Sequence, residues 1–157
     1  MRIGIGYDIH PFGPAGTLVL GGVRFEGERG LEGHSDADVL VHAVIDALLG
    51  AAGLGDIGTH FPPGDPRWKG ADSIRLLEAT AAMLKERGLS VESVDSTVIA
   101  EAPRLAPHIA AMRERIARAL KADVTRVNVK ATSNEGLGAI GRGERIAAMA
   151  VALLGEA

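Results

Sequence analysis

The stretch VESVDSTVIAEAPRLAPHIAAMRERIARALKADVTRVNVKA, residues 91–131, decides the fold. Its first ten residues are rich in β-branched side chains and predict a strand over residues 91–100. After Pro107, apolar residues recur every three or four positions over residues 109–120, which predicts an amphipathic helix. Residues 127–131 alternate and predict a second strand. Such a unit favours two parallel strands joined by a right-handed crossover.

The flanking segments add further strands. Residues 2–7 alternate loosely and predict a first strand. Residues 17–20 and 23–25 flank Gly21-Gly22 and predict a hairpin, so three strands are expected near the N-terminus. The apolar run of residues 146–154 predicts one more strand near the other end.

Two further helices are expected before residue 91. Ser35 is a candidate N-cap for an apolar helix that continues to about Ala52. Asp72 or Ser73 caps a second helix, which Gly88 ends. No repeat or linker is visible, so we expect one α/β (α+β) domain over residues 1–157. It should be a two-layer sandwich, with a mixed β-sheet and helices on one face.

Two glycine-rich stretches are candidate functional loops. Residues 53–70 contain five glycines and three prolines, which makes this segment too long to be an idle connector in a compact domain. Residues 134–143 are similarly rich in glycine and need a ligand or a partner to order them.

Composition excludes several function classes. The chain has no cysteine, so a metal must be held by histidine and carboxylate, and a reducing cytoplasmic location is expected. A net charge of −3 and only 3% aromatic residues argue against nucleic-acid binding. No signal peptide and no membrane-spanning apolar run are recognised, so no membrane association is expected.

Three residues form a candidate zinc site. Asp8 and His10 lie two residues apart after the first strand, which places their side chains on one side of an extended chain. With His42 they supply one oxygen and two nitrogens and leave a fourth tetrahedral position open, as in catalytic zinc sites. Asp46, one helical repeat after His42, is the candidate to orient its ring. A chance triplet and a buried core histidine remain the alternative interpretation.

Two segments are candidates for binding phosphate. His34 and Ser35 precede a helix, where free N–H groups and the helix dipole favour an anion, although Ser35 is equally interpretable as a plain N-cap. Residues 132–135, Thr-Ser-Asn-Glu, follow a strand and offer two hydroxyls and a carboxylate that suit a diphosphate with magnesium or manganese. A polar turn is the alternative.

Two further groups have open interpretations. Arg142 can clamp a phosphate or merely pair with Glu144. Residues 100–107 contain two prolines, and this stiff segment either reads a nucleobase edge through its backbone or is only a rigid connector.

Six motifs, in this order and spacing, together resemble the 2-C-methyl-D-erythritol 2,4-cyclodiphosphate synthase family. The resemblance covers nearly the whole chain, and although each motif alone is moderately specific, their collinear arrangement makes coincidence improbable. The motifs are GYDIHPF at residues 6–12, HSDADVLVHA at 34–43, GDIGTHFP at 55–62, VDSTVIAEAP at 94–103, VNVKATSNEGLG at 127–138 and GRGE at 141–144.

The resemblance implies roles for particular residues. Asp8, His10 and His42 bind a catalytic zinc ion, one per subunit, and Glu135 binds a second ion, Mg²⁺ or Mn²⁺. His34 and Ser133 support the transition state. The substrate-binding residues that it implies are Asp8, Ile9, His10, His34, Ser35, Asp56, Ile57, Gly58, Phe61, Asp65, Ala100, Glu101, Ala102, Pro103, Arg104, Leu105, Ala106, Thr132, Ser133, Asn134, Glu135 and Arg142.

The resemblance also implies a reaction and an assembly. The substrate is a cytidine diphosphate of methylerythritol that carries a 2-phosphate, and its cyclisation releases CMP in non-mevalonate isoprenoid biosynthesis. The implied assembly is a homotrimer with active sites between subunits. Ser133, Pro63 and Ala139 depart from the family's common threonine, aspartate and phenylalanine. The alternatives are a metal-dependent hydrolase of a nucleoside diphosphate derivative and a non-enzymatic trimeric module that binds isoprenoid diphosphates.

Overall fold

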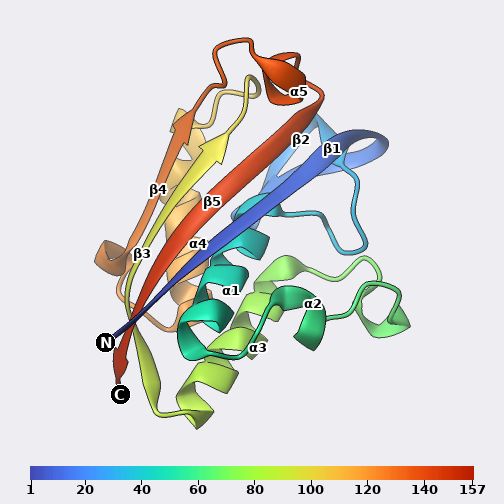
Figure 1. Ribbon diagram of the computed structural model, residues 1–157. Helices are drawn as coiled ribbons and strands as arrows, with labels where there is room; N and C mark the ends of the chain where they lie inside the picture. The colour runs from blue at the N-terminus through green and yellow to red at the C-terminus, as the bar shows by residue number, and fades with distance from the viewer.

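β3 (Leu89–Ile99) and β4 (Val127–Thr132) run parallel, and α4 (Ile109–Leu120) connects them, as the central segment predicts. The computed structural model describes residues 1–157 and places this unit at one edge of a five-stranded sheet (Figure 1). The strand order is β2-β1-β5-β3-β4, and every pair other than β3–β4 is antiparallel. The predicted C-terminal strand, β5 (Arg145–Glu156), is therefore the central strand of a mixed sheet.

The N-terminal hairpin is confirmed, but its first strand is longer than expected. β1 (Arg2–Leu20) pairs with β2 (Val23–Leu31) around the Gly21-Gly22 turn. The sequence predicts two separate strands where β1 is continuous. The irregular residues between Phe12 and Thr17 shift the register without ending the strand, so only two strands precede the first helix.

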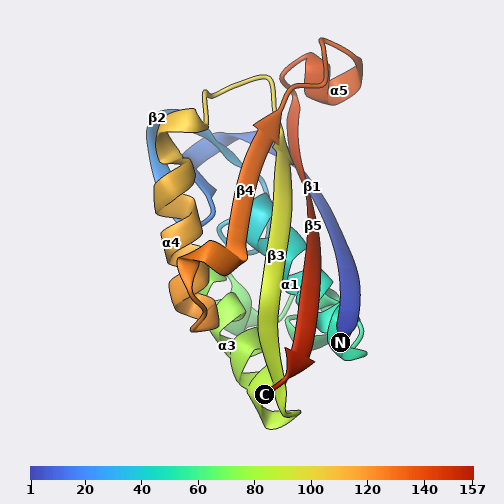
Figure 2. The ribbon, with the colours of Figure 1, turned by 90° about the vertical axis from the view of Figure 1, so that its left-hand side faces the viewer.

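The helices lie on one face of the sheet (Figure 2). The three long ones are α1 (Val39–Ala52), α3 (Ser73–Glu86) and α4. Short helical turns occupy the loops: α2 (Ile57–His60), α5 (Gly138–Gly141), and the 3₁₀ turns η1 (Pro66–Trp68), η2 (Ala106–His108) and η3 (Val124–Arg126). α3 begins after the predicted cap, Asp72. No helix combines the length and the hydrophobicity needed to cross a bilayer.

The prediction that Ser35 caps α1 is wrong, because Asp38 is the N-cap residue. The buried Asp38 carboxylate accepts hydrogen bonds from the backbone N–H groups of Val41, Gly21 (2.9 Å) and Gly22 (2.7 Å). Burial, with the nearby charge of Asp36, raises the pKa of Asp38 to about 6 although these N–H groups oppose the change. One side chain thus fastens the β1–β2 turn to the start of α1.

The two faces of the sheet differ. The face toward the helices belongs to one cluster of 34 buried apolar residues. On the opposite face, β1 and β5 carry large apolar side chains that are exposed to solvent. Ile3 is 73% exposed, Ile5 65% and Tyr7 54%, and Met149 and Val151 lie on the neighbouring strand. Five such neighbours form an apolar patch of the kind that marks an interaction surface.

Two glycines allow β1 to approach α1 closely. A Cβ atom at Gly4 would overlap the carbonyl oxygen of Ala47, and one at Gly6 would overlap the carbonyl oxygen of Ala43. Both oxygens belong to the helix backbone, which cannot move aside without shifting the helix. The spacing between β1 and α1 therefore depends on these two positions having no side chain.

We predict that Gly6→Ala lowers the free energy of unfolding by about 1–3 kcal/mol, because overpacking pushes α1 off the sheet. Gly50→Ala is the matched control: it adds the same methyl group within α1, where the nearest atom is 3.9 Å away. It should raise stability by about 0.5–1 kcal/mol through helix propensity. Urea denaturation measures both, and equal stability of Gly6→Ala and the unaltered protein would contradict the role of Gly6.

Candidate active site

Asp8, His10 and His42 meet at one point, where β1 passes over α1. Their ligand atoms lie within 4.8 Å of one another. Asp8 Oδ2 is 2.8 Å from His10 Nε2 and 2.9 Å from His42 Nδ1, and the two ring nitrogens are 3.3 Å apart. The predicted metal triad is thus assembled from two elements, and its two histidines lie 32 residues apart in the sequence.

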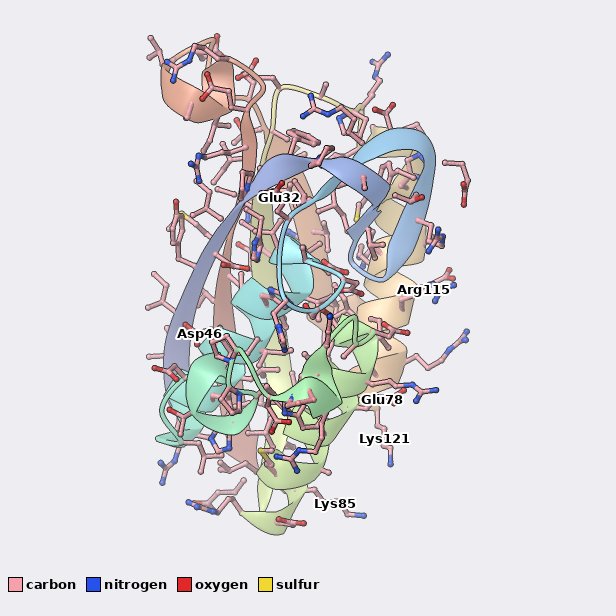
Figure 3. All side chains as sticks on the ribbon, turned by 90° about the vertical axis from the view of Figure 1, so that its right-hand side faces the viewer. Glu32, Asp46, Glu78, Lys85, Arg115 and Lys121 are labelled. Carbon is pink, nitrogen blue, oxygen red and sulfur yellow. The ribbon has the colours of Figure 1, made fainter.

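The donor set fits a tetrahedral zinc ion. Zinc bonds to oxygen and nitrogen of about 2.0–2.1 Å separate the ligand atoms by about 3.3 Å, close to the separations found here. The hydrogen-bond partner of the other His10 ring nitrogen also suits a metal ligand. His10 Nδ1 lies 2.8 Å from the carbonyl oxygen of Glu32. A carbonyl only accepts, so Nδ1 carries the hydrogen and Nε2 keeps its lone pair toward the triad. Figure 3 labels Glu32 and Asp46 on this side of the molecule.

The triad is electrostatically coupled. Burial alone would raise the pKa of the Asp8 carboxyl, but its hydrogen bonds with His10 and His42 hold that pKa well below its ordinary range. Burial alone would lower the pKa of His10, yet the hydrogen bond and the charge of Asp8 raise it above its ordinary value. Asp8 is therefore a carboxylate that attracts positive charge to this point, from a proton or from a metal ion.

Asp46 does not orient His42, contrary to the prediction. Its Oδ1 accepts a hydrogen bond from the backbone N–H of Ile57 at 3.0 Å, at the start of α2. Both ring nitrogens of His42 have other partners: Nδ1 faces Asp8, and Nε2 faces the hydroxyls of Ser35 and Ser73. Asp46 instead fixes the start of α2, whose Ile57 and Gly58 lie beside the triad.

The triad opens into a cavity of about 280 Å³. Part of the glycine-rich loop of residues 53–70 lines this cavity beside the triad. At the edge of the cavity, Asp56 caps α2 by accepting a hydrogen bond from the backbone N–H of Thr59. His34 is held by a hydrogen bond of 3.0 Å between its Nε2 and the carbonyl oxygen of Asp65. The lining residues are Tyr7, Asp8, His10, His34, Ser35, His42, Asp46, Ile57, Gly58, Phe61, Pro63, Trp68 and Leu76.

The predicted diphosphate and cytidine segments do not line this cavity. They lie together elsewhere, since Glu101 Oε1 accepts a hydrogen bond from the backbone N–H of Asn134 at 2.8 Å. Asp8 on β1 pairs with Ala148 on β5, Ala148 pairs with Val98 on β3, and Val98 pairs with Ala131 on β4. The end of β4 therefore lies three strands from the triad, which is a distance of about 14 Å across the sheet. Within one chain, the candidate site therefore has two separate parts.

The second part is exposed and polar. Ser133 Oγ donates to Glu135 Oε1 at 3.2 Å, and Glu135 has a left-handed backbone with φ of 52°. Arg142 pairs with Glu144 at 2.6 Å, which is the simpler of the two interpretations open for it from the sequence. These contacts hold the polar side chains of the second part in place.

Several residues near the triad were not anticipated. Ser73, at the start of α3, contacts His42 and was considered only as a helix cap. Trp68 and Leu76 form an apolar wall of the cavity, and the Trp68 indole N–H is buried without a hydrogen-bond partner. No spacing pattern links these positions to Asp8 or His42, so only the fold reveals them.

We predict that His42→Ala loses most of its bound zinc and leaves the protein folded, because two ligands hold the ion far less tightly than three. Elemental analysis after dialysis measures the zinc, and circular dichroism measures the fold. His108→Ala is the control, since that ring packs on Phe25 outside the cavity. Unchanged zinc in His42→Ala would remove this residue from the ligand set.

Named relatives match this chain along nearly its whole length. The "2-C-methyl-D-erythritol 2,4-cyclodiphosphate synthase" of Desulfosudis oleivorans is 61% identical over 156 residues, which are 99% of this chain and 93% of that protein. The relative of the same name from Symbiobacterium thermophilum is 57% identical over 154 residues, 98% of each chain.

Solved structures have the same fold. The bifunctional IspDF of Campylobacter jejuni superimposes with a TM-score of 0.95 at 42% identity; the match covers 99% of this chain, which spans only 42% of that longer one. The Plasmodium falciparum IspF, solved as a CDP complex, gives a TM-score of 0.86 at 33% identity over 99% of this chain and 96% of that one. The sequence model of the YgbB family matches residues 1–155. The chain therefore belongs to the YgbB family, whose relatives at this identity are 2-C-methyl-D-erythritol 2,4-cyclodiphosphate synthases.

Proposed function

We propose that the chain converts 4-diphosphocytidyl-2-C-methyl-D-erythritol 2-phosphate to 2-C-methyl-D-erythritol 2,4-cyclodiphosphate and CMP. The observation that carries this proposal is the triad of Asp8, His10 and His42, whose ligand atoms converge beside a cavity and leave room for a substrate oxygen. Relatives that share 54–61% of the sequence carry the name of this activity.

The reaction is an intramolecular phosphoryl transfer. An oxygen of the 2-phosphate forms a bond to the β-phosphorus, the bond from that phosphorus to the bridging oxygen breaks, and CMP leaves with the electron pair. Because both reacting groups are anionic, positioning and charge neutralisation are the main requirements, and no protein nucleophile is needed. Asp8, His10 and His42 would hold a zinc ion, whose positive charge would polarise a phosphate oxygen.

The chain's own side chains divide the remaining work. His34 and Ser35 line the cavity beside the triad, where an imidazole N–H and a hydroxyl can donate to phosphate oxygens. His34 Nε2 must then leave the carbonyl oxygen of Asp65, so substrate binding and the position of that loop are coupled. Ile57 and Phe61 form an apolar wall for the methylerythritol carbon chain.

The second part of the site suits the diphosphate and the cytidine. Thr132 and Ser133 offer hydroxyls, and Glu135 is an exposed carboxylate that can hold Mg²⁺ or Mn²⁺ together with diphosphate oxygens. Residues 100–106 present a turn that lies against this segment through Glu101 and provides the cytidine pocket. To bind a phosphate, Arg142 has to break its ion pair with Glu144.

The two parts come together in a homotrimer. They lie about 14 Å apart in one chain, while one substrate joins the cytidine diphosphate to the methylerythritol phosphate. The exposed apolar face of Ile3, Ile5, Tyr7, Met149 and Val151 would be buried between subunits, where it stabilises an assembly. A neighbouring subunit then supplies the cytidine pocket to each triad.

We predict that incubation with this substrate and magnesium yields a cyclic diphosphate and CMP. Phosphorus NMR distinguishes the coupled pair of phosphates in the ring from free phosphate. The matched control omits the enzyme, and a second control adds a chelator, which should stop turnover. Release of inorganic phosphate or of methylerythritol phosphates would identify a hydrolase instead.

We also predict that two inactive variants complement each other. His42→Ala lacks the triad, and Ala106→Trp fills the cytidine pocket at an exposed position. If each site takes its parts from two subunits, random reassembly from equal amounts leaves about one site in four intact. Mass spectrometry confirms that subunits exchange. With exchange confirmed, no recovered activity would place both parts within one subunit.

A further inference from the structure

The two ring nitrogens of His42 face different surroundings. Nδ1 points to the other members of the triad, 2.9 Å from Asp8 Oδ2. Nε2 points away from them, 2.9 Å from Ser73 Oγ and 3.0 Å from Ser35 Oγ. Which nitrogen carries hydrogen decides whether the ring can serve the metal site, because a metal binds only a nitrogen with a free lone pair.

The partners of Ser73 settle the direction of its hydrogen bond. Ser73 Oγ donates to Asp36 Oδ1 in a short hydrogen bond, and Ser73 N donates to Asp36 Oδ2 at 3.0 Å. A carboxylate has only acceptors, so the single hydroxyl hydrogen of Ser73 is committed to Asp36. Toward His42, Ser73 therefore presents only a lone pair, and the hydrogen between them belongs to Nε2.

The opposite arrangement is electrostatically unfavourable. If Nε2 lacked a hydrogen, its lone pair would face that of Ser73 Oγ at 2.9 Å, inside a site where Ser73 is fully buried and water cannot intervene. Donation from Ser35 to Nε2 would not remove this repulsion. Ser35 is thus left free to direct its hydroxyl hydrogen into the cavity that it lines.

We propose that Asp36 and Ser73 are positioning residues that hold His42 with hydrogen on Nε2 and so present the Nδ1 lone pair to the metal ion. This inference rests on the proposed metal site. It assigns to the buried Ser73 and its carboxylate partner the role that the sequence suggested for Asp46. It also joins α3, which begins at Ser73, to α1, which carries His42. The carboxylate, the hydroxyl and the imidazole form one chain of hydrogen bonds that ends at the metal site.

The test uses Ser73→Ala, which removes the hydroxyl with little change of volume. Ser96→Ala is the matched control. Ser96 is also buried, but it lies on β3, which β5 separates from the β1 strand of the triad, and its Oγ donates to the carbonyl oxygen of Asn128 on β4. Zinc affinity is measured on the zinc-loaded protein by competition with a chelator. The ring N–H of His42 is followed by ¹H–¹⁵N NMR, and circular dichroism monitors the fold.

We expect Ser73→Ala to bind zinc roughly 10- to 100-fold more weakly and to lose the exchange-protected Nε2–H signal, with an unchanged fold. Ser96→Ala should keep both properties. If Ser73→Ala does not fold, Asp36→Ala carries the test, because it removes the acceptor that commits the Ser73 hydroxyl hydrogen, and weaker zinc binding is expected. Unaltered zinc affinity and an unaltered Nε2–H signal in a folded variant would overturn the proposed role of Asp36 and Ser73. Failure of the unaltered protein to bind zinc would instead overturn the proposed metal site.

Discussion

The close approach of β1 to α1 is the constraint on which the active site depends. Gly4 and Gly6 allow the strand to lie against the helix carbonyls of Ala47 and Ala43. Because the strand continues directly from Gly6 to Asp8 and His10, the same contact sets how far these side chains lie from His42. A wider spacing would separate the three ligand atoms beyond the reach of one ion. Packing and the convergence of the three ligand atoms therefore rest on the same two glycines.

Hydrogen bonds behind the triad complete this arrangement. The carbonyl oxygen of Glu32 lies behind His10, and the hydroxyl of Ser73 lies behind His42. Each partner fixes which ring nitrogen is left to face the cavity. The protein thus prepares three ligand atoms that point inward, while His34 is held by a loop carbonyl oxygen that a substrate would replace in the proposed reaction. A firm ligand set beside an exchangeable loop is the arrangement expected of an enzyme that positions charged groups.

Much of the fold and the metal triad could be predicted from the sequence. The central unit of strand, helix and strand follows from local periodicity. Residue type and spacing placed Asp8, His10 and His42 in one candidate ligand set, and the ligand atoms of these residues do converge. One error concerns the fold, because β1 continues through the segment where the sequence predicted two separate strands. The others concern side-chain partners. Side chains on a helix lean toward its N-terminus, so the His42 ring extends toward the segment before α1 and toward Ser73. Asp46 lies four residues further along the helix and binds the α2 backbone instead.

Other features depend on contacts that no local pattern encodes. Ser35 satisfies the residue preference for an N-cap, but Asp38 caps α1 because it also reaches the two glycines of the hairpin turn. Ser73 lies 31 residues from His42, and only the packing of α3 on α1 brings them together. The separation of the site into two parts is similarly a property of the sheet, since it follows from strand order.

Diffraction from zinc-containing crystals at the zinc absorption edge tests the central claim most directly. The account predicts one strong anomalous peak per chain, with a carboxylate oxygen of Asp8, Nε2 of His10 and Nδ1 of His42 bonded to the ion at about 2.0–2.2 Å. A peak bound by other residues, or one bonded to His42 through Nε2, would contradict it.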